Sequence, residues 1–187
     1  EHVGAPFIDI SGTCCPEGLT HMALAYDKAA EEIQMWKSGL RAQENYIPAP
    51  FVINITDGFP EERDLTDQQS RNKALLAASR LKSINVPDGN VLLFNIHIDG
   101  KPGAEPALMF PSIRPNEVNR AVLYDASSGM EPKFVERTKR FNFPATIGSR
   151  FMVSNISDMR ILGRLIVFGS SVSGLTTDTG RRESPIG

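Results

Sequence analysis

The chain has 187 residues, of which 41% are hydrophobic and 22% charged, with a formal net charge of −2. This length suits one domain with a sizeable core, and the nearly neutral charge gives no reason to expect a nucleic acid or an anionic membrane as partner. No apolar stretch approaches the roughly 20 residues that span a bilayer, and residues 1–4 lack the basic start and apolar core of a signal peptide.

Short apolar runs alternate with amphipathic segments along the chain. In chain order we predict a strand at 7–10, a helix at 19–37, a strand at 50–56, a helix at 67–83, a strand at 91–98, helices at 116–127 and 131–141, a strand at 151–153 and a helix at 156–168. Such alternation is typical of a mostly parallel sheet covered by helices on both faces, a three-layer α/β fold. We expect one domain over 1–169 and a flexible polar tail over 170–187.

The two cysteines, Cys14 and Cys15, are adjacent. Neighbouring cysteines rarely form a disulfide because the geometry of the bridge is specific, and two thiols without further Cys or His nearby do not make a zinc site. We therefore expect reduced thiols in a cytoplasmic protein.

The first predicted helix has an apolar face whose members recur at helical spacing: Met22, Tyr26, Ala29, Ile33 and Trp36. Thr20 is placed to cap its start, because a threonine hydroxyl accepts a hydrogen bond from a free N–H of the first turn. The strand at 91–98 is apolar almost throughout, which predicts a central strand covered on both faces.

The strand at 50–56 ends abruptly in Thr56-Asp57-Gly58. Asp57 therefore lies where the strand leaves the sheet, and in open α/β sheets ligands collect outside the carboxyl ends of the strands. A carboxylate there is a hard oxygen donor, which suits Mg²⁺ or a similar cation.

Several segments resemble von Willebrand factor A domains. Gly18-Leu19-Thr20-His21-Met22 resembles their Gly-Gly-Thr-Pro-Met element, and the segment 52–58 resembles their strand ending in Thr-Asp-Gly. The segments 88–97, 123–128 and 148–155 look like a bacterial subgroup of uncharacterised A-domain proteins. The resemblance covers most of the chain and implies a Rossmann-like sheet.

The resemblance also implies a metal-ion-dependent adhesion site, in which three loops hold Mg²⁺ (or Mn²⁺ or Ca²⁺) and an open position takes a carboxylate from a partner protein. Thr20 matches the second of these loops and Asp57 the third. The implied function is a cation-dependent protein-binding module in a bacterial signalling or stress-response assembly.

The first metal-site element, Asp-x-Ser-x-Ser, departs from the family pattern. Asp9-Ile10-Ser11-Gly12-Thr13 spells Asp-x-Ser-x-Thr, but the short interval to Thr20 has no room for the intervening helix. We interpret 7–10 instead as the strand before the Thr20 loop, and expect the family's first strand and helix to be lacking. The exposed sheet edge would then invite another chain to supply the missing strand.

Two other functions stay open. One is a metal-free structural subunit of a larger complex. The other is a hydrolase or phosphatase with Asp57 as nucleophile, although such phosphatases generally need a second Asp where Phe59 stands, and no phosphate loop or Gly-x-Ser-x-Gly elbow occurs.

Other polar residues near this edge have more ordinary interpretations. A histidine at a strand end, such as His97 with Asp99 nearby, is usually just hydrogen-bonded, although His21 and His97 could also join a metal site. Asp64 and Asp67 suit a solvated loop and a helix cap.

Overall fold

The computed structural model describes residues 18–39, 48–98 and 106–172. Their elements, in chain order, are α1 (Met22–Gly39), β1 (Phe51–Thr56), α2 (Asp67–Ser83), β2 (Asn85–Val86), β3 (Gly89–Asn90), β4 (Leu92–Ile98), β5 (Leu108–Met109), α3 (Val118–Ala126), α4 (Pro132–Lys139), β6 (Met152–Ile156) and α5 (Met159–Val172). The predicted α/β class is confirmed for this part of the chain.

The main sheet has the strand order β1-β4-β6-β5. The pairs β1–β4 and β4–β6 are parallel, and the short β5 pairs antiparallel with β6. Strands β2 and β3 form a separate hairpin at the turn that follows α2. The sheet is therefore mostly parallel, and β1 is the last of its described strands on one side.

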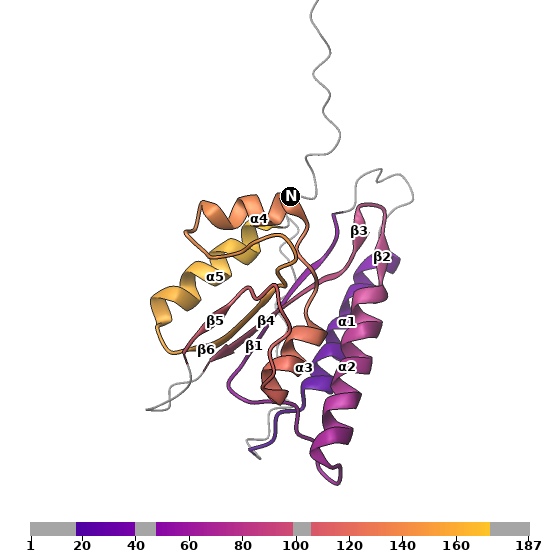
Figure 1. The fold of residues 1–187 in the computed structure, drawn as a ribbon. Coiled ribbons are helices and arrows are strands. Elements are labelled where there is room, and N and C mark those ends of the chain that lie inside the picture. Colours follow the sequence, from indigo (N-terminus) through magenta and orange to yellow (C-terminus); the bar gives the residue numbers. More distant parts are fainter. Residues whose placement is uncertain (1–17, 40–47, 99–105, 173–187) are drawn as a thin grey trace, which may run out of the picture.

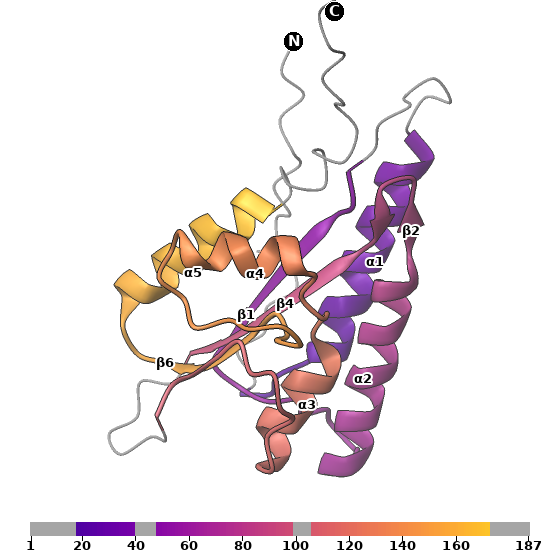
Figure 2. The ribbon, with the colours of Figure 1, turned by 45° about the horizontal axis from the view of Figure 1, so that its top comes forward.

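Helices cover both faces of this sheet (Figures 1 and 2). On one face, α1, α2 and α3 enclose a core rich in alanine, and on the other, α4 and α5 enclose a core rich in phenylalanine. Strand β4 lies between these two cores, and its middle residues are buried, as the sequence predicts for a central strand.

The bounds of α2 agree with the predicted helix because the start signal is local. Thr66 accepts a hydrogen bond from the Gln69 amide, and the Gln69 side chain accepts one from the Thr66 amide. This reciprocal pair is a capping box. The N-cap is thus Thr66, and Asp67 is the first helical residue.

The start of α1 and its apolar face differ from the prediction. The helix begins at Met22, and the His21 carbonyl accepts the first helical hydrogen bond from the Ala25 amide. Thr20 therefore precedes the helix and does not cap it. Trp36, predicted to be in the core, is 39% exposed because its flank of α1 lies beyond β1, the outermost strand on that side among the described residues.

The second half of the chain also differs in its bounds. Strand β5 lies inside the proline-rich segment for which we expect only irregular loop, and β6 extends to Ile156. Helix α5 continues through Val172, into the segment predicted to be a tail. The predicted strand at 7–10, the cysteines and the end of the tail lie outside the described residues.

No helix in the described ranges is both long enough and apolar enough to cross a membrane.

Candidate functional site

The loop before α1 and the loop after β1 meet at the carboxyl edge of the sheet. A Cβ atom added to Gly58 would overlap the Thr20 hydroxyl oxygen and would lie 3.2 Å from Thr20 Cβ. The Thr20 side chain is therefore packed against the Gly58 backbone, directly beside Asp57. The structure thus brings together the two loops that carry the predicted site residues.

Each residue of the Thr-Asp-Gly turn has a distinct structural role. The Thr56 hydroxyl donates to the Gly58 carbonyl at 2.9 Å and accepts from the Gly58 amide at 3.1 Å, which closes the turn. Gly58 is needed because a side chain there would displace Thr20. Asp57 is exposed, and its carboxylate has no hydrogen bond or ion pair within the described ranges.

The loop after Asp57 fixes the backbone of Thr20. The Thr20 carbonyl accepts hydrogen bonds from the Met22 amide at 2.8 Å and from the Glu61 amide at 3.0 Å. The next residue, Glu62, contacts His21 Nδ1 at 3.4 Å and Lys73 Nζ at 3.0 Å through Oε2. Its other oxygen is buried without a hydrogen-bond partner among the described residues.

A buried polar network sets the position of α1 over the sheet. The Tyr26 hydroxyl donates to Asn95 Oδ1 at 2.6 Å, and Asn54 Nδ2 donates to the same oxygen at 2.9 Å. Asn95 Nδ2 donates to Ser127 Oγ at 2.9 Å, which extends the network to the end of α3. Burial raises the pKa of Tyr26 well above its usual value, against the opposing effect of both amides, so its hydroxyl keeps its proton.

Sequence reasoning missed this network, although a signal for it was present. Asn54 and Asn95 each stand in the middle of an otherwise apolar strand, and they lie opposite each other in the β1–β4 register. A buried amide must find hydrogen-bond partners, so an asparagine at such a position indicates a polar cluster.

His97 belongs to the carboxyl edge but is turned into the protein. It is 3% exposed, its Nδ1 lies 3.1 Å from Asn155 Oδ1, and its ring stacks on Phe59 with a centroid distance of 4.4 Å. His21 instead pairs with Glu62. The two histidines thus have different neighbours, and Asp99 lies outside the described residues.

The donors that could hold a cation at this edge are the Thr20 hydroxyl and the Asp57 carboxylate. Both are hard oxygen ligands of the kind that Mg²⁺ prefers, and Mg²⁺ usually keeps several waters beside one or two carboxylates. Within the described ranges, no three His, Cys, Asp or Glu side chains gather in a way that could hold a metal ion. A cation held by these two donors alone would therefore have to keep several of its waters.

A small cavity of about 180 Å³ adjoins Thr20. It extends from the start of α1 to the end of β1, and the strand residues that line it are Asn54, Ile55 and Thr56. The space beside the candidate site thus reaches the last three residues of β1.

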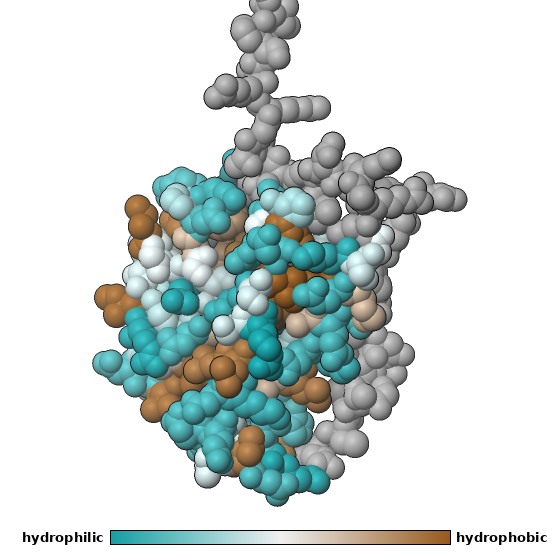
Figure 3. Space-filling model, turned by 90° about the vertical axis from the view of Figure 1, so that its right-hand side faces the viewer, coloured by the Kyte–Doolittle hydropathy of each residue, from teal (hydrophilic) through white to brown (hydrophobic). Residues whose placement is uncertain are grey.

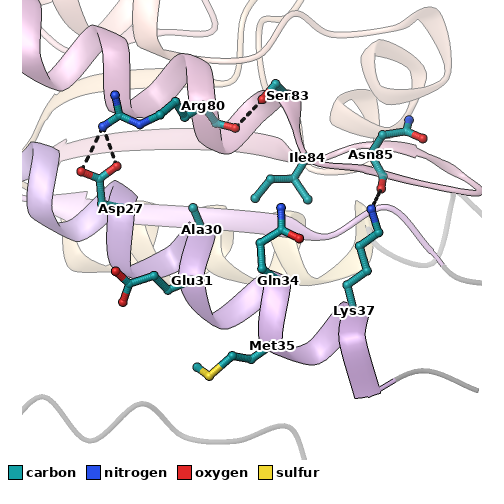
Figure 4. A pocket seen from close by; sticks show the side chains of 10 residues that line it. All are labelled: Asp27, Ala30, Glu31, Gln34, Met35, Lys37, Arg80, Ser83, Ile84 and Asn85. Atoms are coloured by element: carbon teal, nitrogen blue, oxygen red, sulfur yellow. Dashed lines mark hydrogen bonds and ion pairs between the residues drawn. The ribbon is translucent and has the colours of Figure 1, made fainter.

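A larger groove of about 1050 Å³ runs between α1 and α2 (Figure 4). The charged groups along it already have partners: Arg80 binds Asp27 at 2.7 Å, Glu31 pairs with Lys28, and Lys37 donates to the Asn85 carbonyl. Since its charges are satisfied, the groove offers less to a polar ligand than the unpaired Asp57 does.

Comparisons with protein-family models, with curated proteins and with solved structures found no match to this chain.

Proposed function

We propose that the carboxyl edge of the sheet is a cation-assisted docking site for a partner protein. Thr20 and Asp57 would hold a divalent cation of the Mg²⁺ type, and a carboxylate from the partner would complete its coordination. The observation that carries the proposal is the packing of the Thr20 side chain against Gly58, beside the unpaired Asp57.

The charge of this pair favours a cation that binds an anionic group of a partner over a cation that is only held in place. One carboxylate and one neutral hydroxyl leave a divalent cation with net positive charge. Such an ion attracts an external anion, and the exposure of Asp57 leaves the partner room to approach. The bacterial setting and the likeness to an adhesion site belong to this proposal and rest on the sequence resemblance.

The test is thermal unfolding of the full chain during titration with MgCl₂ or MnCl₂. A ligand that binds only the folded state stabilises it by about 1.4 kcal/mol at ten times its dissociation constant, or about 3–6 °C for a chain of this size. We expect Asp57→Asn to abolish this shift and Thr20→Val, which keeps the side-chain shape, to weaken it.

The matched control is Asp64→Asn. Asp64 is another exposed acid of the same loop, and asparagine tolerates its positive φ of 65°. This variant should keep the full shift. An equal loss in Asp57→Asn and Asp64→Asn would show a general effect of loop charge and would contradict the proposed site.

The metal-free structural subunit remains the second candidate, because the described part of the chain gathers no group of three His, Cys, Asp or Glu side chains that could hold a metal ion. It predicts no cation-dependent shift in the parent protein. The hydrolase alternative predicts steady phosphate release from an aryl phosphate that is lost in Asp57→Asn.

A further inference from the structure

Two cationic side chains meet at the end of α3, toward the amino edge of the sheet. Lys82 lies in the last turn of α2, and Arg150 lies just before β6. Lys82 Nζ donates to the Ser127 carbonyl at 3.4 Å, and Arg150 Nη1 donates to the same oxygen at 2.8 Å, so the two cations are close neighbours. Because β6 runs parallel to β4 and β4 to β1, this pair lies at the opposite edge from Thr20 and Asp57.

Part of this arrangement completes the end of α3. A helix leaves its last carbonyl groups without partners inside the helix, and basic side chains often bond to them. Lys82 Nζ donates to one of these groups, the Asp125 carbonyl, at 3.2 Å, and Ser127 is the C-cap residue. This role uses two of the three N–H groups of the lysine but only one nitrogen of the Arg150 guanidinium group.

The other edge of the Arg150 guanidinium group has no partner among the described residues. Arg150 makes its one hydrogen bond to Ser127 through Nη1, whereas Nε and Nη2, which share the other edge, bond to nothing in the described ranges. Arg114 shows what this edge binds elsewhere in the protein. Its Nε and Nη2 atoms bond to the Asp125 carboxylate at 2.7–3.0 Å. The free edge of Arg150 is therefore suited to an oxyanion.

The guanidinium group of Arg150 is held in place by contacts within the protein. The Ser127 carbonyl bonds to one end of it, and the Tyr124 ring lies against it, with a distance of 4.7 Å from Arg150 Cζ to the ring centre. The Tyr124 hydroxyl in turn donates to the Ser112 carbonyl at 3.3 Å. A planar donor group that is already fixed loses less entropy when it binds an oxyanion.

The two positive charges are not balanced in the described part of the chain. Neither Lys82 nor Arg150 forms an ion pair there, and the nearby Asp125 carboxylate is bound by Arg114. Burial, and then the neighbouring Arg150, lower the pKa of Lys82 to about 8, with Asp125 opposing them. Both half-buried side chains are thus mainly charged at neutral pH. An anion beside them would offset this charge.

We propose that Lys82 and the free edge of Arg150 form a binding site for a phosphate group, either in inorganic phosphate or in a phosphate monoester. Near pH 7 such a group carries a charge of about −1.5 to −2 and has three oxygens that accept strong hydrogen bonds. Arg150 would bind two of these oxygens, and the third N–H of Lys82 would bind another. A carboxylate has one charge and two oxygens, so it would leave one cation unbalanced.

The test is titration of the full, ¹⁵N-labelled chain with sodium phosphate at pH 7 and constant ionic strength, followed through the arginine Nε–H resonances. Two half-buried cations should bind phosphate with a dissociation constant of about 1 mM. We expect the Arg150 resonance to shift and to saturate in this range. The Arg114 resonance should stay, because Asp125 already occupies that edge. Sodium acetate should bind at least about tenfold more weakly, because it carries a single charge.

Two variants test the two parts of the site, with the backbone amides around Ser127 as the readout and at temperatures where each variant is folded. Arg150→Lys keeps the charge but loses the planar pair of donors, and should weaken phosphate binding by about tenfold. Lys82→Met removes the second charge and should weaken it by a similar factor. The matched control is Arg140→Lys, because Arg140 is exposed at the end of α4, and it should leave the affinity unchanged.

Methyl phosphate as a second probe separates the two sources of the phosphate group. Tighter binding of methyl phosphate than of inorganic phosphate assigns the site to monoesters, and the reverse assigns it to free phosphate.

Three results would overturn the proposal. The first is no shift of the Arg150 resonance up to about 50 mM phosphate, which would mean that the two cations only complete the end of α3 or already pair with an acid outside the described ranges. The second is equal binding of acetate and phosphate, and the third is equal affinity of Arg150→Lys and Arg140→Lys for phosphate. None of these results bears on cation binding at Thr20 and Asp57, so the two proposals fail separately.

Discussion

The two faces of the sheet are built by different means. Under α4 and α5 the core is aromatic: the ring of Phe94 lies within 5.7–6.2 Å of four other phenylalanine rings. Under α1, α2 and α3 the core is rich in alanine, and most of its other residues are methionine, leucine, isoleucine and valine. It also contains the hydrogen-bonded side chains of Tyr26, Asn54 and Asn95.

Because of this difference, one face of the sheet mainly stabilises the domain and the other mainly positions α1. Apolar burial is strong but non-directional, so the aromatic face holds the domain together without fixing any one helix to a fraction of an ångström. Hydrogen bonds have direction, and those of Tyr26 fix α1 relative to β1 and β4. Because Thr20 stands just before α1, the polar face also fixes where Thr20 meets Gly58.

Seen from the right-hand side of Figure 1, the space-filling view shows hydrophobic atoms in separate patches among hydrophilic ones (Figure 3). Four substitutions test this contrast between the two faces.

The largest effect is expected from the aromatic face. Phe94→Ala removes a fully buried ring and should lower the free energy of unfolding by about 3–5 kcal/mol. Urea unfolding measures this loss. Any rise in the unfolding midpoint that Mg²⁺ causes in the parent protein should also occur in this variant, as long as the variant is folded. A loss below about 1 kcal/mol would mean that this core is looser than the ring contacts indicate.

Gly58→Ala should have the next largest effect, because the new methyl group collides with the Thr20 hydroxyl. We expect a loss of about 1–3 kcal/mol, together with loss of the cation response. Gly129→Ala is the control, since no atom lies within 4 Å of an added Cβ there. Thr20→Ala in the Gly58→Ala background should recover part of the stability but not the cation response. Full tolerance of Gly58→Ala would contradict the close packing.

Tyr26→Phe tests the polar face and should cost about 1–2 kcal/mol, because the buried amides of Asn54 and Asn95 lose a partner. The control is Tyr124→Phe, whose hydroxyl makes a single 3.3 Å bond at the surface. If the two variants unfold alike, the buried network is not what anchors α1.

The smallest expected effect is a pH dependence of the free energy of unfolding, which comes from Lys82. Burial, and then the nearby Arg150, lower the pKa of Lys82 from 10.5 to about 8, and Asp125 opposes them. Between about pH 8 and 10.5 the unfolded chain therefore binds more protons than the folded one, so this lysine makes stability rise with pH across that range. Because Lys82 is partly solvated, the rise should be only about 1 kcal/mol.

Lys82→Met should flatten this part of the stability profile, measured by urea unfolding from pH 7 to 10. Lys139→Met, on the surface of α4, serves as the control and should leave the profile unchanged. If the free energy of unfolding rises equally with pH in Lys82→Met, another group causes the pH dependence.

Local signals explain what the sequence could predict of the fold. The bounds of α2 are predictable because its alanines recur at helical spacing, and the capping pair Thr66 and Gln69 is a further local signal that the prediction did not use. The central strand β4 was equally clear from its apolar run. Strand β5 was missed because two residues carry no periodicity, and the exposure of Trp36 was missed because helical spacing does not reveal where a sheet ends.

The candidate site was only partly accessible to sequence reasoning. The meeting of the two loops that carry Thr20 and Asp57 was expected from a resemblance between motifs, since nothing in their spacing of 37 residues indicates contact. The contacts of Glu62 with His21 and Lys73 and the Tyr26 network both join segments far apart in the chain. Only the Tyr26 network had a local signal in the sequence, namely the two mid-strand asparagines.

We propose that Thr20 and Asp57 share one divalent cation, and paramagnetic broadening of backbone amide resonances by substoichiometric Mn²⁺ tests this proposal. We expect the Gly58 and His21 amides to broaden first, excess Mg²⁺ to reverse the broadening, and Asp57→Asn to prevent it. Broadening centred on the acids of α1, such as Glu31 and Glu32, or no selective broadening at all, would contradict it.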